Sequence, residues 1–283
     1  MSNRKLARIG HPGKENQITN THYTSKDVSI PDDFLTGPAD KPVTLTPVPF
    51  ATSQVPEYDG LIAVVLDNVI SPEECQQLLK LAEASAETQD EDASPWRPAL
   101  VNVGVGREIA ITDYRNSDRI IWDKQTIVDR LWNRCIQADG LKELLSKTPD
   151  DDIGLPGRWV FERLNDRMRF LKYTEGQFFN SHFDGPYHYT ADGTEIRTHY
   201  TVHLYLNDSE ETSPTGEGFR GGATPFLSRD EKRRIDVNPK AGSVLIFQHR
   251  GLRHQGSKVL SGVKYTMRTD ILYRWVSDEK TGP

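Results

Sequence analysis

Three residues of this chain have the types and the spacing that an iron(II) site needs: His182, Asp184 and His254. One residue separates His182 from Asp184, and residues i and i+2 of a strand point to the same side. Two imidazoles and one carboxylate can hold one face of a metal ion and leave its other positions open. A His-x-Asp pair is common by chance, and it could also be a polar pair on a half-exposed strand. The assignment therefore depends on the surrounding sequence.

Short strands must position these residues. From Trp159 onward, segments rich in β-branched and aromatic residues alternate with Gly and Pro, which is the pattern of a strand-rich region. The predicted strands cover about 169–174, 178–184, 198–206, 243–248 and 263–275. The third ligand, His254, has to come from a strand that folds back beside the first two ligands.

Helices are predicted in the first half of the chain. Ser71 is a good N-cap, Pro72 suits the first helical position, and Glu74 completes a capping box for a helix that extends to about Ser85. A second helix is expected from Lys124 to Gln137, where apolar residues recur at helical spacing. Helices followed by many short strands predict an α+β fold, a double-stranded β-helix (jelly roll) with supporting N-terminal helices.

Composition sets the domain organisation. Residues 1–55 are polar and rich in Pro and Thr, so we expect an extended or disordered arm, with one short edge strand within 43–50. Residues 56–283 are expected to form a single domain whose jelly roll spans about 159–275. Residues 61–66 predict a buried strand, and 140–157 a largely polar connection.

The bulk numbers exclude several classes of protein. The net charge of −6 gives no overall basic field for nucleic acid. The two cysteines, Cys75 and Cys135, are too few and too far apart for a disulfide framework or a zinc site, and are expected to be buried thiols. We see no apolar run long enough for a membrane span and no secretory signal, so the expected location is the cytoplasm, with the nucleus as the alternative.

Six sequence blocks occur in an order and spacing that resemble one enzyme family. They are 169–173, 178–184, 201–208, 221–226, 239–247 and 254–264. Together they resemble the prolyl 4-hydroxylase branch of the Fe(II)/2-oxoglutarate dioxygenases, over about residues 60–275. The resemblance implies that His182, Asp184 and His254 bind iron. It favours His254 over His249 as the distal ligand, because Lys264 follows His254 in register.

The same resemblance implies a co-substrate pocket. Lys264 would pair with the distal carboxylate of 2-oxoglutarate, since a dianion chelating the metal at one end needs a cation at the other. Tyr205, with Thr201 on the same strand, and Tyr173 are all expected to line this pocket. Arg268 lies on the same strand face as Lys264. Either cation could anchor 2-oxoglutarate, and Arg268 could instead bind a carboxylate of the primary substrate.

Two further segments are candidates for substrate contact. Residues 113–119 precede the second predicted helix, where related enzymes place a substrate-covering loop; ordinary capping and solvation is the alternative. The polar stretch 190–198 could act as a lid.

The implied activity is hydroxylation of an unactivated C–H bond by Fe(II), 2-oxoglutarate and O₂, with ascorbate as a candidate reductant. The substrate is expected to be a prolyl residue of a peptide or a small amino-acid-like metabolite. Two alternatives remain open at this point. The Arg268-x₅-Arg274 pattern resembles nucleic-acid demethylases of the AlkB type, and a non-catalytic jelly-roll binding module would share the fold.

Overall fold

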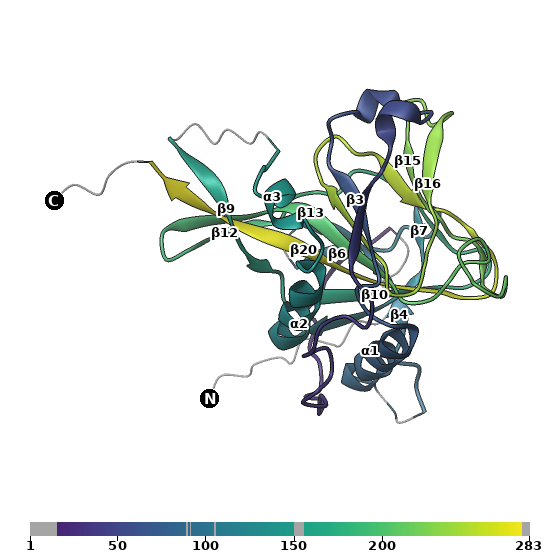
Figure 1. The fold of residues 1–283 in the computed structure, drawn as a ribbon. Coiled ribbons are helices and arrows are strands. Elements are labelled where there is room, and N and C mark those ends of the chain that lie inside the picture. Colours follow the sequence, from purple (N-terminus) through teal and green to yellow (C-terminus); the bar gives the residue numbers. More distant parts are fainter. Residues whose placement is uncertain (1–15, 89, 91, 105, 150–155, 279–283) are drawn as a thin grey trace, which may run out of the picture.

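The computed structural model describes residues 16–88, 90, 92–104, 106–149 and 156–278 (Figure 1). Many more of these residues lie in β-strands than in helices. The largest sheet has ten strands. In path order they are β2 (Thr44–Pro47), β3 (Ala63–Asp67), β17 (Val244–Gln248), β13 (Thr194–Tyr205), β20 (Lys264–Ser277), β10 (Arg167–Tyr173), β8 (Asp118–Asp123) and β4 (Arg97–Pro98), with β12 (His188–Ala191) beside β13 and β9 (Gly157–Leu164) beside β20.

A five-stranded sheet covers one face of the large sheet. Its order is β16 (Arg234–Val237), β15 (Thr224–Leu227), β18 (His254–Gly256), β11 (Phe178–His182) and β7 (Arg115–Asn116). Phe226 of β15 packs against Phe247 of β17, with ring centroids 5.5 Å apart. Two facing antiparallel sheets of this kind are a jelly roll, so the predicted fold class is confirmed. We call the face of the large sheet that meets the five-stranded sheet the inner face.

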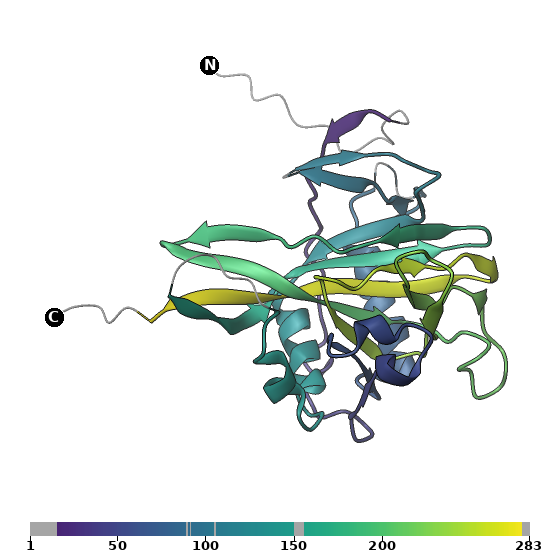
Figure 2. The same ribbon diagram turned by 90° about the horizontal axis from the view of Figure 1, so that it is seen from above.

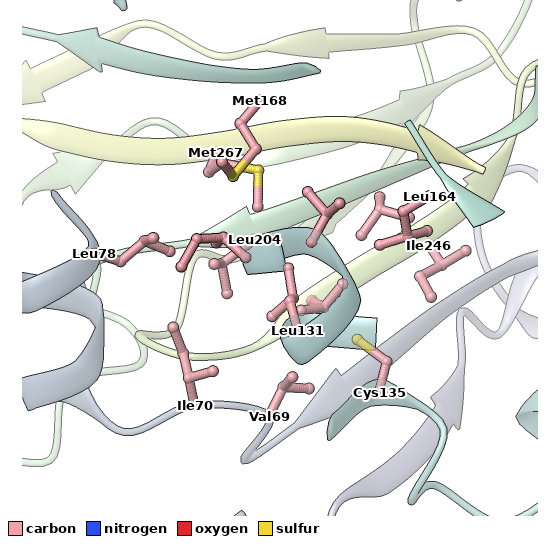
Figure 3. Packing of buried hydrophobic residues seen from close by; sticks show 14 of the residues in the cluster. Val69, Ile70, Leu78, Leu131, Cys135, Leu164, Met168, Leu204, Ile246 and Met267 are labelled. Atoms are coloured by element: carbon pink, nitrogen blue, oxygen red, sulfur yellow. The ribbon is translucent and has the colours of Figure 1, made fainter. Parts of the chain in front are cut away.

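The helices cover the opposite, outer face of the large sheet. These are α1 (Pro72–Ser85), α2 (Gln125–Cys135) and the short α3 (Leu141–Leu145), and Figure 1 shows α1 and α2 together below the long strands β13 and β20. Leu78 of α1 and Leu131 of α2 share one core with Leu204 of β13 and Met267 of β20 (Figure 3). The outer face is therefore the main hydrophobic core.

Helix α1 begins as the sequence predicts. The Ser71 hydroxyl accepts a hydrogen bond from the Glu74 backbone N–H, and the Glu74 carboxylate accepts one from the Ser71 N–H. This reciprocal pair satisfies two donors that the first turn leaves free. Helix α2 matches its predicted range within two residues at each end. Cys75 and Cys135 are free and buried in these two helices, as expected.

The segment 16–55 runs along the domain and contributes strands and core residues. Its first strand, β1 (Ile18–Asn20), joins β6 (Arg107–Ile109) and β5 (Val101–Gly104) in a three-stranded sheet, which Figure 2 shows as a separate layer beside the long strands. Strand β2 lies at the edge of the large sheet, where an edge strand was predicted. Phe34 and Leu35 are buried. The first 15 residues of the predicted arm lie outside the described residues.

Other connections complete the fold. β14 (Arg220–Gly221) pairs with β19 (Val259–Ser261), and two 3₁₀ turns, η1 (Phe50–Thr52) and η2 (Pro56–Tyr58), precede β3. One prediction differs from the structure: the connection predicted for 140–157 contains α3, whose Leu141 and Leu145 are buried. The stretch 190–198, a predicted lid, belongs to a hairpin of β12 and β13. Among the described residues, no helix is long and apolar enough to cross a membrane.

Candidate metal centre and the polar inner face

The structure brings His182, Asp184 and His254 together. His182 ends β11 and lies directly opposite His254, which begins β18. Asp184 lies two residues beyond the end of β11, so the predicted strand 178–184 is shorter than expected. The candidate ligand atoms all lie within 4.8 Å of one another. The Nε2 atoms of His182 and His254 are 3.6 and 3.7 Å from the Asp184 oxygens.

Backbone carbonyls fix the orientation of both imidazoles. The Nδ1 atoms of His182 and His254 lie 2.7 and 3.2 Å from the carbonyl oxygens of Asn180 and Leu252. A carbonyl only accepts, so each Nδ1 carries the proton and each neutral ring presents an Nε2 lone pair to the centre. Burial and the neighbouring imidazole lower the pKa of His182 to about 3, and burial also lowers the pKa of His254. Both rings are therefore neutral, as metal ligands must be.

Neighbouring side chains keep Asp184 ionised and fix its orientation. Burial alone would raise the pKa of Asp184, but Arg268 and the two histidines outweigh it and hold this pKa well below its ordinary value. The Thr201 hydroxyl donates to one oxygen at 2.6 Å, and Arg268 Nη1 lies 2.8 Å from the other. The donor set of two neutral imidazoles and one anionic carboxylate fits an iron(II) ion.

Aromatic rings enclose the histidine side of the centre. The ring of Phe179 stacks on His182 with centroids 3.8 Å apart, and the ring of Phe247 meets His254 edge-on at 4.6 Å. A register shift in β11 between Phe179 and His182 accompanies this stacking of two residues three positions apart. These rings limit water access from that side.

Lys264 lies in a buried pocket near the centre. It is 2 % exposed, and its ammonium group lies 5.4 and 5.9 Å from the ring centroids of Tyr173 and Tyr205. Nζ donates to the Gly222 carbonyl at 2.6 Å, and among the described residues no carboxylate forms an ion pair with it. Burial lowers the pKa of Lys264 to about 7. An isolated buried ammonium is costly, so this pocket fits an anionic ligand.

Other polar atoms in this region also lack partners. Thr266 Oγ1 and His203 Nε2 are buried and form no hydrogen bond, although buried polar groups normally find one. Thr266 shares a strand face with Lys264, and His203 lies on β13 directly opposite Arg268. The Tyr205 hydroxyl donates to Thr224 Oγ1 at 2.9 Å. The pocket thus has both a cation and free hydrogen-bonding groups for a carboxylate.

A glycine makes room for the Lys264 side chain. Gly222 has a φ of +69°, and a Cβ there would lie 3.1 Å from Lys264 Cδ and 2.8 Å from Phe219 Cε2. A larger residue would therefore be strained and would displace both neighbours.

Arg268 differs from Lys264 in its partners, although the sequence favoured Lys264 as the anchor and left Arg268 open as the alternative. Besides Asp184, Arg268 contacts Asp270 at 3.2 Å and Thr201 Oγ1 at 3.3 Å. Arg268 therefore already has carboxylate partners, whereas Lys264 has none among the described residues. The Thr201 hydroxyl, also predicted to be in the co-substrate pocket, donates to the candidate ligand Asp184.

Sequence reasoning did not identify a group of charged residues beside Asp184. Arg169 Nη1 lies 3.1 Å from Asp270, and His249 Nε2 lies 3.5 Å from the same carboxylate, away from the three candidate ligands. Arg169 and Arg268 are direct cross-strand partners, an arrangement of like charges that normally destabilises a sheet. The alternation of Lys264, Thr266, Arg268 and Asp270 was a signal that could have revealed this polar face.

Segment 113–119, predicted to contact the substrate, places Arg115 beside the candidate metal centre. The Arg115 guanidinium lies 4.6 Å from the ring centroid of Phe179, on β11, the strand that carries His182. Its Nη1 makes one long hydrogen bond, 3.4 Å, to the Leu100 carbonyl, and its Nε is buried without a partner. The next arginine along this segment, Arg119, has a full ionic partner in Glu108 at 2.9 Å.

A family model matches part of the C-terminal half of the chain. Residues 168–270 match the family model described as the 2OG-Fe(II) oxygenase superfamily. No curated protein matches the chain by sequence.

Prolyl hydroxylases are among the solved structures to which this chain is similar. The viral collagen prolyl hydroxylase of Paramecium Bursaria Chlorella virus-1 is 21 % identical, with 77 % of this chain and 98 % of that chain covered and a TM-score of 0.44. The Pseudomonas putida prolyl-4-hydroxylase is 15 % identical, with 77 % and 96 % covered and a TM-score of 0.46. A Trichoplax adhaerens prolyl hydroxylase, solved with a peptide of hypoxia inducible factor, is 16 % identical, with 78 % and 88 % covered and a TM-score of 0.47.

Proposed function

We propose that this protein is an Fe(II)- and 2-oxoglutarate-dependent hydroxylase, with His182, Asp184 and His254 as the iron ligands; the match of residues 168–270 to the 2OG-Fe(II) oxygenase superfamily supports this. The single observation that carries this proposal is the convergence of two Nε2 lone pairs and one carboxylate within 4.8 Å. When bound, iron(II), 2-oxoglutarate and O₂ together supply the oxidation, in which one oxygen atom enters a C–H bond of the substrate and the other enters succinate, with release of CO₂.

The residues of the chain bind and orient these groups. The carbonyls of Asn180 and Leu252 hold the imidazoles in the correct tautomer, and Thr201 holds the carboxylate of Asp184. Such neighbours of metal ligands affect metal affinity nearly as much as the ligands themselves.

We assign the distal carboxylate of 2-oxoglutarate to Lys264. This cation has no carboxylate partner among the described residues, whereas Arg268 is already paired with Asp184 and Asp270. Tyr205 and Thr224, whose hydroxyls are hydrogen-bonded to each other, can offer a further donor to the same carboxylate. Tyr173 forms the opposite wall of the pocket.

The proposed substrate is a small molecule or a peptide with an unactivated C–H bond. The prolyl hydroxylases among the similar structures suggest a prolyl side chain as one candidate. The fold alone does not select it, because one fold serves many substrates.

The direct test is an anaerobic titration of the purified protein with Fe(II) and then 2-oxoglutarate, followed by admission of air. We expect a weak visible absorption band when both are present and release of succinate after oxygen is admitted. Zn(II) in place of Fe(II) is the control, since zinc has no redox chemistry and should give neither signal. Folded, metal-loaded protein that gives no band and no succinate would contradict the proposal and favour a non-catalytic binding module.

A further inference from the structure

The surroundings of the candidate centre, on the inner face of the large sheet and on β7 of the facing five-stranded sheet, contain more positive than negative charge. Four cations adjoin the centre or its pocket, but only two carboxylates. The cations are Arg115, Arg169, Lys264 and Arg268, and the carboxylates are Asp184 and Asp270. Arg119, the next cation along this face, is balanced by Glu108. The surplus within this group of described residues is therefore two positive charges.

Bound iron(II) and 2-oxoglutarate leave this surplus unchanged, because the ion adds two positive charges and the co-substrate two negative ones. If Lys264 binds the distal carboxylate, the remaining unmatched cation is Arg115. Burial and its cationic neighbours Arg119 and Arg268 lower the pKa of Arg115 to about 10, so it remains charged at neutral pH. Burying a charge without a partner is unfavourable, and a functional reason for keeping Arg115 is a ligand that neutralises it.

The position of Arg115 suits a substrate contact. Its guanidinium stacks on one ring, Phe179, that itself stacks on the candidate ligand His182. It is partly accessible, and within the described part of the chain its guanidinium makes one long hydrogen bond, to the Leu100 carbonyl. A guanidinium presents paired N–H donors that match the two oxygens of a carboxylate.

We propose that the substrate of this oxygenase carries a carboxylate and that Arg115 binds it. This inference rests on the proposed function and adds the substrate class. The carboxylate belongs either to a free acid or to an acidic side chain of a peptide, and both present the same group to Arg115. An uncharged prolyl side chain would leave Arg115 without an anionic partner.

The test measures thermal unfolding of the protein loaded with Co(II) and 2-oxoglutarate under anaerobic conditions and constant ionic strength. The probes are matched carboxylate and amide pairs: L-proline and L-prolinamide, L-leucine and L-leucinamide, and blocked Gly-Asp-Gly and Gly-Asn-Gly peptides. Ligands that bind the folded state raise its midpoint. We expect at least one carboxylate to bind tenfold or more tightly than its amide, and the pair that shows this distinguishes the free acid from the peptide.

Variants assign the preference to Arg115. Arg115→Gln should remove the preference for the carboxylate while the dissociation constant of 2-oxoglutarate stays within about twofold of the original. Arg115→Lys keeps the charge without the paired donors and should retain part of the preference for the carboxylate. This variant replaces Arg115→Gln in the test if the glutamine variant folds poorly. Arg229→Gln removes an exposed arginine outside the site and is the matched control.

Three results would overturn the inference. Carboxylates and amides could bind equally, no carboxylate could bind at all, or Arg115→Gln could weaken 2-oxoglutarate instead, which would assign Arg115 to the co-substrate. A second measurement distinguishes failure of the substrate class from failure of the proposed function. It is the release of succinate by the same preparation with Fe(II) in air, without any probe. If succinate forms, these results overturn only the substrate class; if none forms, the proposed function itself fails.

Discussion

The two faces of the large sheet show how the same strands can serve stability on one side and chemistry on the other. On the outer face, Val202 and Leu204 of β13 and Met267 and Ile271 of β20 are buried in the main core against the helices. On the inner face, alternate residues of the same strands are polar. They include Lys264, which has no carboxylate partner among the described residues, and Thr266, whose buried hydroxyl has no hydrogen-bond partner there. The period of two along each strand separates the two sets.

This difference shows where a ligand is needed. The outer face needs no ligand, because removal of its apolar side chains from water already stabilises the fold. Each buried polar group without a partner on the inner face costs about 1–3 kcal/mol. The inner face therefore stores a cost that a bound anion and metal can relieve, and changes to the two faces should have opposite consequences.

The largest effect is expected at the centre itself. His182→Ala should abolish specific Fe(II) or Co(II) binding and reduce succinate formation by at least about 100-fold, because it removes one of three protein ligands. Calorimetric titration with Co(II) measures the binding. His188→Ala, which changes an exposed histidine on β12, is the control and should bind metal normally. Unchanged metal affinity in His182→Ala would disprove the ligand assignment.

On the outer face, Leu204→Ala should lower the free energy of unfolding by about 2–5 kcal/mol, since it opens a cavity in the main core. The dissociation constant of 2-oxoglutarate should stay close to its original value in the fraction that remains folded. Urea denaturation and a binding titration on the same sample measure the two quantities. A large loss of 2-oxoglutarate affinity with little loss of stability would mean that the two faces are not separable.

On the inner face, Lys264→Met should weaken 2-oxoglutarate binding without lowering the stability of the protein. It removes a charged hydrogen-bond donor, so the dissociation constant of 2-oxoglutarate should rise about 10- to 100-fold. The free energy of unfolding of the ligand-free protein should be unchanged or higher, because an unpaired buried charge disappears. Lys258→Met, at an exposed lysine, is the control. If Arg268→Met raises the dissociation constant while Lys264→Met does not, Arg268 is the anchor.

The smallest effect is a pH dependence from Lys264. Its pKa of about 7 lies below the ordinary 10.5, so above pH 7 the folded protein must take up a proton to bind 2-oxoglutarate. The dissociation constant should therefore rise about tenfold per pH unit above 7, equivalent to about 1.4 kcal/mol. The ligand-free protein should gain stability from this group between pH 7 and 10.5, because the unfolded state then holds the extra proton. Titrations at pH 6–9 measure the slope, and a slope that persists in Lys264→Met would contradict this origin.

Local signals in the sequence were sufficient for the main elements of the fold. The capping box at Ser71 and the apolar spacing near Ile127 predicted α1 and α2, and the alternating runs predicted β10, β13, β17 and β20 closely. The sequence did not reveal β1, because its three residues have no apolar pattern and form a strand only by pairing with β6. Helix α3 is too short for a periodic pattern to distinguish it from a loop.

The candidate site could be predicted only in part. The residue types and spacing of His182, Asp184 and His254 indicated that they would lie together, and the structure places them so. The pairing of Arg169 with Arg268 depends on the register between β10 and β20, which no single segment specifies. Arg268 has carboxylate partners and Lys264 has none among the described residues, and this difference likewise depends on which carboxylates the fold brings near each cation.

The pairing of β3 with β17 has a consequence for synthesis of the protein on the ribosome. Ile62, just before β3, bonds to Gln248, 186 residues later in the chain, and β3 lies between β2 and β17 in the sheet. At about 5–20 residues per second, an emerging β3 waits roughly 10–40 s for its partner. During that time an apolar strand with open hydrogen-bonding edges is exposed, so chaperone supply and translation speed should influence the yield of folded protein.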